Sequence, residues 1–139
     1  MVGTLQMNNF KVHVLFDPCA THSFIARRIV TKIGQEVKIV GKGFVIKTPS
    51  GNRVETNSMY VGVGVSLARY ETEVDLIPLE LHDFDVILSI DWLSKYKAQI
   101  HCYTKTVVFL ILEGRRMVFK GERIPNLINL VSVVTAGSC

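Results

Sequence analysis

The chain has few cysteines that could cross-link its fold, and it has no apolar segment long enough to cross a bilayer. Its three cysteines, Cys19, Cys102 and Cys139, are odd in number and far apart. This spacing argues against a disulfide framework and against a Cys-x-x-Cys metal site, and it predicts three reduced thiols. No uninterrupted apolar stretch approaches the roughly 20 residues of a membrane span. The first residues also lack the basic region and apolar run of a signal peptide, so we expect an intracellular, cytoplasmic protein.

Long runs of charge are absent as well. Lys and Arg number 16 against 12 Asp and Glu, which gives a net charge of +4. The longest basic runs are the pairs Arg27-Arg28 and Arg115-Arg116, and no basic motif interleaved with aromatic residues accompanies them. Nucleic acid is therefore an unlikely partner, and a nucleic-acid-binding domain is the weakest of the functional hypotheses because it depends on charge alone.

What the sequence does contain is enough apolar residues for one globular domain. Its 139 residues are 48% hydrophobic and 20% charged, which fits a single domain with a sizeable core. Short runs rich in Val, Ile, Thr and Tyr predict strands. They lie at residues 10–16, 44–47, 53–65 and 71–78, and a hairpin is predicted over 107–119. Many short strands joined by tight turns favour a β-sandwich or barrel.

Two helices are expected between these strands. Over residues 23–33, Ile25, Ile29 and Ile33 recur every four positions, as on the buried face of a helix. Gly34 suits the C-terminal cap of that main helix. A second, short helix is expected over residues 91–96.

Asp17 directly follows the apolar strand that ends at Phe16, beside a turn. Such a place is where a barrel presents chemistry, yet aspartate is also common in ordinary turns. Position alone therefore favours a plain turn residue, and the neighbouring residues decide between the two interpretations.

Residues 15–25 read LFDPCATHSFI. This segment resembles the active-site segment of plant gypsy-type retrotransposon proteases, which are retropepsin-like aspartic proteases. That family has two apolar residues, then Asp, Ser or Thr, Gly and Ala, and soon after Ser or Asn before Phe-Ile. Residues 84–93, FDVILSIDWL, resemble the family's Phe-Asp-Val-Ile-Leu-Gly-x-Asp-Trp-Leu segment and are the more specific match.

Other parts of the chain are similar to the same family. Residues 44–65 resemble its flap hairpin, with the tip at Pro49, Ser50 and Gly51. Residues 98–102 and 107–109 resemble the strands that follow, so the likeness covers about residues 5–120. It implies an all-β, retropepsin-like closed barrel with a flap, one main helix and one short helix. We assign residues 1–120 to this domain and residues 121–139 to a C-terminal extension or linker.

The resemblance also implies a mechanism. Retropepsins are homodimers in which each subunit gives one aspartate to a shared site, and here that residue is Asp17. Two adjacent carboxylates share one proton, so one acts as a general base on water while the other polarises the carbonyl of a peptide or polyprotein substrate. No metal and no cofactor is needed. Asp85 and Asp91 correspond to structural positions, at the start of a strand and at the cap of the short helix.

Three residues depart from the family pattern in and around the active-site loop. Pro18 replaces a Ser or Thr whose hydroxyl bonds the partner subunit's loop, and proline can donate no hydrogen bond. Cys19, followed by Ala20, replaces a Gly that leaves room for the substrate backbone. Ser89 replaces another Gly and brings a hydroxyl that needs a partner. We therefore expect an aspartic endopeptidase with weak or lost activity, or alternatively a non-catalytic dimerisation or peptide-binding module.

Other chemistries are less favoured. Cys19 as a nucleophile would need a base nearby, but neither His22 nor His13 stands at a spacing known from cysteine peptidases. His82 and His101 show no paired ligand spacing, which argues against a zinc site.

Overall fold

Strands make up most of the chain in the computed structural model, which describes residues 1–47, 53–67, 70–110 and 116–121. In order, the elements are β1 (Val2–Met7), β2 (Phe10–Asp17), β3 (Ser23–Ala26), the 3-10 helix η1 (Arg27–Ile33), β4 (Lys38–Lys47), β5 (Arg53–Leu67), β6 (Tyr70–Leu79), β7 (Val86–Ser89), the α-helix α1 (Ile90–Lys95), β8 (Ala98–His101), β9 (Thr106–Leu110) and β10 (Arg116–Lys120).

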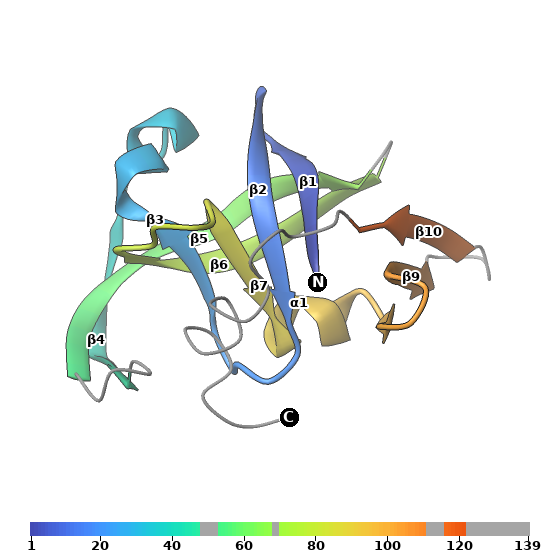
Figure 1. Cartoon of the computed structure of the whole chain (residues 1–139). Helices are drawn as coiled ribbons and strands as arrows, with labels where there is room; N and C mark the ends of the chain where they lie inside the picture. Colours follow the sequence, from blue (N-terminus) through green and yellow to red (C-terminus); the bar gives the residue numbers. More distant parts are fainter. Residues whose placement is uncertain (48–52, 68–69, 111–115, 122–139) are drawn as a thin grey trace.

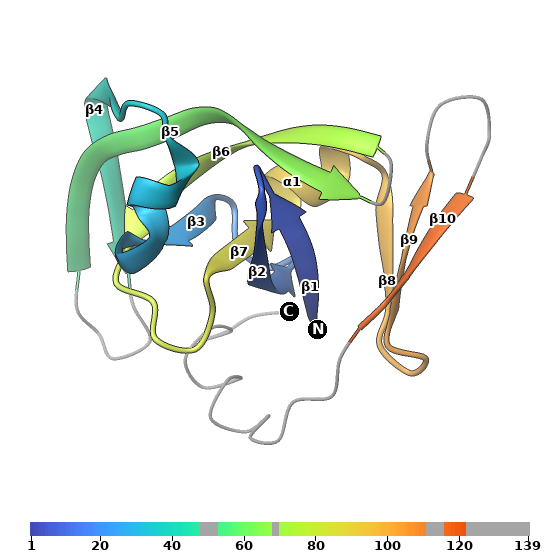
Figure 2. The same cartoon turned by 90° about the horizontal axis from the view of Figure 1, so that it is seen from above.

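Seven of these strands form one sheet that closes on itself. The strand order is β1-β2-β7-β3-β6-β5-β4, and β1 also pairs with β5. Six strands therefore complete a ring, and β4 lies outside it, paired with β5. This arrangement confirms the predicted closed barrel. Strands β8, β9 and β10 form a separate sheet on the side of the molecule opposite β4 (Figures 1 and 2).

The core lies inside the ring and under the second sheet. Phe16 stacks on Trp92 with ring centroids 6.3 Å apart, and Phe109 meets the edge of Trp92 at 5.4 Å. Phe119 of β10 packs against Phe16 at 5.6 Å. A Cβ on Gly3 would stand only 2.2 Å from the Phe119 ring, so the glycine is what lets this ring approach β1. Aromatic contacts thus tie the second sheet to the barrel.

The predicted main helix over residues 23–33 is wrong in its first turn. Residues 23–26 form β3, which pairs in parallel with β6 and antiparallel with β7. Backbone pairing with two strands overrides the four-residue spacing of the isoleucines, because Ile25 is fully buried between them. The remainder, η1, is a 3-10 helix, and it ends as expected at Gly34, whose φ of 69° is left-handed.

The other predicted elements are present with shifted ends. Strands β2, β4, β5 and β6 cover the four predicted runs, and α1 begins one residue before the predicted short helix. The predicted C-terminal hairpin is confirmed by the antiparallel pairing of β9 with β10. Its turn residues lie outside the described part of the chain.

Candidate active site

Asp17 is the last residue of β2 and is almost fully buried, with 3% of its surface exposed. The strand runs parallel to β7, with Phe16 opposite Leu88 and Asp17 opposite Ser89. Apolar residues of both strands are buried on the two faces of this ladder. Their burial favours the pairing of β2 with β7. The carboxylate is therefore held at a fixed position where two buried parallel strands end together.

Residues 18–22 connect Asp17 to β3 and contain the predicted active-site loop of Pro18, Cys19 and Ala20. The backbone N–H of Cys19 donates to Asp17 Oδ1 over 3.0 Å. At the far side, the N–H of Ile90 donates to the Ala20 carbonyl over 3.1 Å, which anchors the loop to the start of α1. Pro18 is exposed within the turn that the first of these bonds closes, and Cys19 and Ala20 are half-buried.

The cysteines differ from the prediction at one position. Cys102 is a free, exposed thiol, as expected. Cys19 is disulfide-bonded, so the prediction of a reduced thiol at this position is wrong. A sulfur engaged in a disulfide is not a thiolate, and the alternative of a Cys19 nucleophile gains no support.

Behind the loop, the hydroxyl group of Ser23 connects several elements by hydrogen bonds. Its buried hydroxyl accepts the N–H of Ser89 over 3.0 Å and donates to Asp91 Oδ1 over 2.7 Å. The same Asp91 oxygen accepts the N–H of Trp92 over 2.8 Å. Asp91 is thus structural, as predicted, but it acts from inside the helix, because the N-cap position is Ser89. Sequence reasoning missed Ser23, although its place in the family's Ser-Phe-Ile motif was a signal.

Ser89 is fully buried, and its hydroxyl oxygen has no hydrogen-bond partner among the described residues. A hydroxyl at this position was predicted to need a partner. It stands beside Asp17 in the parallel ladder.

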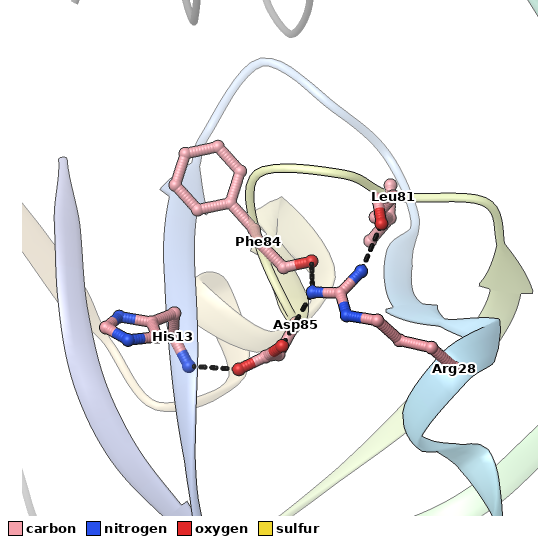
Figure 3. A network of polar contacts seen from close by, with 5 residues as sticks. All are labelled: His13, Arg28, Leu81, Phe84 and Asp85. Carbon is pink, nitrogen blue, oxygen red and sulfur yellow. Dashed lines mark hydrogen bonds and ion pairs between the residues drawn. The ribbon is translucent and has the colours of Figure 1, made fainter. Parts of the chain in front are cut away.

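A second polar network lies at the start of the β2–β7 ladder, the end opposite Asp17 (Figure 3). The Arg28 guanidinium forms an ion pair with Asp85 Oδ1 at 2.7 Å and donates to the carbonyls of Phe84 and Leu81. Asp85 Oδ2 accepts the backbone N–H of His13 over 2.8 Å. Asp85 precedes β7 directly, so its predicted structural role agrees with these contacts.

The loop of residues 18–22 also touches the strand that leads into the predicted flap. The His22 ring meets the Phe44 ring of β4 edge-on, with centroids 4.9 Å apart. Strands β4 and β5 stay paired up to Lys47 and Arg53. The predicted tip residues Pro49, Ser50 and Gly51 lie outside the described residues.

Within the described ranges, no cluster of three or more His, Cys, Asp or Glu side chains is arranged to hold a metal ion. No helix among the described residues is long and apolar enough to span a membrane. The cytoplasmic location stays a prediction.

Comparison with known proteins agrees with this geometry. The family profile described as "Retroviral aspartyl protease" matches residues 1–114. Among solved structures, the chain is similar to the retroviral protease-like domain of Ddi1 from Leishmania major, with 15% sequence identity and a TM-score of 0.63. The match covers 89% of this chain and 97% of that one. At this identity, the likeness is evidence for the fold alone. Curated proteins give no significant match.

The fold is therefore retropepsin-like. The match over residues 1–114 places the chain in the retroviral aspartyl protease family.

Proposed function

We propose that this chain is the aspartic endopeptidase domain of a plant gypsy-type retroelement, and that Asp17 is its catalytic residue. The observation that carries the proposal is the placement of Asp17, buried at the joint end of β2 and β7 with the Cys19 N–H on its carboxylate. A carboxylate fixed in this way is preorganised to act on a water molecule.

One chain supplies half of such a site. The other two acids of the matching motif are engaged elsewhere, Asp85 by Arg28 and Asp91 by Ser23 and Trp92. The second carboxylate accordingly comes from Asp17 of an identical subunit, so the working form is a homodimer.

The chemistry needs only these two carboxylates and water. Since two adjacent like charges cannot both persist, one Asp17 is ionised and the other protonated. The ionised one takes a proton from water, which attacks the peptide carbonyl polarised by the protonated one. The carbon–nitrogen bond then breaks, and the nitrogen leaves with a proton as an amine. The substrate class is a polypeptide, such as the polyprotein of the retroelement.

We infer that this activity is weak or lost. Pro18 is exposed beside Asp17 and has neither a hydroxyl nor an N–H with which to bond a second loop. The same observation favours the second candidate, a non-catalytic dimerisation or peptide-binding module on this fold.

The proposed domain comprises residues 1–120, and residues 121–139 form an extension or linker. Packing supports this boundary, because β10 pairs with β9 and its Phe119 lies against Phe16 of the core.

The test is cleavage of an unfolded peptide library at mildly acidic pH by the concentrated chain. We expect slow cleavage that a statine-type inhibitor blocks and that Asp17→Asn abolishes. Light scattering over a concentration series should show dimers at the concentrations that cleave. Peptides that bind without being cut would select the binding module, and a strict monomer would remove the basis for a shared site.

A further inference from the structure

Two buried serines flank the end of β2, and their hydroxyl groups are in opposite situations. Ser23 and Ser89 are both fully buried. The Ser23 hydroxyl makes two hydrogen bonds, whereas the Ser89 hydroxyl makes none among the described residues. A buried hydroxyl without a partner is costly, so its presence calls for a physical reason.

The register supplies a candidate partner. Ser89 lies opposite Asp17 in the parallel ladder, and residues in register on neighbouring strands present their side chains to the same face of the sheet. Both side chains are buried at that face. The Ser89 backbone is fixed by its N–H bond to Ser23, but its side chain can turn between staggered rotamers and its hydroxyl can donate.

We propose that Ser89 is a positioning residue, whose hydroxyl donates a hydrogen bond to the ionised Asp17 carboxylate in the working site. The inference rests on the proposed function of Asp17. In this proposal, β7 supplies a hydrogen bond of the kind that Pro18 in the active-site loop cannot donate, because proline has no donor group. The Asp17 carboxylate would then be held from two sides, by the Cys19 N–H and by the Ser89 hydroxyl.

The test compares Ser89→Ala with Thr72→Val in the intact chain. Thr72 is a matched control, because it is also buried and its hydroxyl bonds the Val65 carbonyl and the Trp92 indole. The first readout is the carboxyl carbon signal of isotope-labelled Asp17 at neutral pH, assigned with Asp17→Asn. We expect the signal to move in Ser89→Ala and to stay in place in Thr72→Val.

The second readout is peptide cleavage, where kcat should fall about tenfold in Ser89→Ala while KM is unchanged. An unmoved Asp17 signal in Ser89→Ala would overturn the proposal, and so would an equal movement in both variants. If neither the native chain nor the variant Pro18→Ser with Cys19→Gly cleaves a peptide, the proposed function fails, but the carboxyl signal still decides whether Ser89 bonds Asp17.

Discussion

The frame that holds Asp17 from behind and the loop that follows it are built differently. The frame consists of β2, β3, β7 and α1, and its contacts are buried side chains and paired backbone, with Ser23 joining three of the four elements. In the loop of residues 18–22, Pro18 and Thr21 are exposed, and few contacts hold its path: the hydrogen bonds at Cys19 and Ala20, the Cys19 disulfide and the contact of the His22 ring with Phe44. The family's fold is thus retained in the frame, and the departures from the family's chemistry concentrate in the loop.

The largest loss of stability should come from removing a large buried side chain from the frame. Trp92 is 1% exposed and contacts Phe16, Phe109 and Tyr96. Trp92→Ala should lower the free energy of unfolding by about 3–5 kcal/mol, since the cavity cannot close between fixed strands. Urea denaturation measures this. The control is Tyr103→Ala, which removes a side chain that is 99% exposed and should change stability by less than about 0.5 kcal/mol. Equal losses in both variants would show that the frame is not the rigid part.

A smaller loss of stability is expected when the ion pair between Arg28 and Asp85 is removed. Arg28→Ala removes the ion pair with Asp85 and the donors to two carbonyls. Because the Arg28 side chain is 46% exposed, water replaces part of what is lost, and we expect a loss of about 1–2 kcal/mol. Arg27→Ala on the neighbouring exposed residue is the control in the same denaturation experiment. A loss above that of Trp92→Ala would reverse the ranking.

The smallest effect on stability should come from Asp17→Asn. Asparagine has nearly the same shape, and its carbonyl oxygen can still accept the Cys19 N–H. Thermal unfolding at neutral pH should therefore give a free energy within about 0.5 kcal/mol of the native chain. A large loss would mean that Asp17 belongs to the frame as a structural acceptor.

The same division explains how far the sequence predicts the molecule. Alternating apolar residues and turn signals predicted β2, β4, β5, β6 and the hairpin of β9 and β10, because these patterns are local, but they did not predict β1. The first turn of the expected helix failed because Ile25 is placed by pairing with two distant strands, which no local pattern reports.

At the candidate site, the family resemblance pointed to Asp17 and to the changed residues Pro18, Cys19 and Ser89. It did not reveal the bonds from Ser23 to Asp91 or from Arg28 to the loop before β7. Those bonds join residues more than 50 positions apart, so only the folded chain brings them together. Whether Asp17 catalyses a reaction stays a prediction.

Restoring the family's loop tests the central claim most directly. Pro18→Ser with Cys19→Gly gives back a hydroxyl and removes a side chain next to Asp17, while the frame is untouched. The native chain, this double variant, and the double variant carrying Asp17→Asn are compared on one peptide library, with Cys19→Ser alone as the control for the lost disulfide. We predict that the double variant cleaves on the order of a hundredfold faster than the native chain, and that Asp17→Asn abolishes the gain. Cleavage that persists without the Asp17 carboxylate, or a double variant as inert as its Asp17→Asn form, would contradict the account.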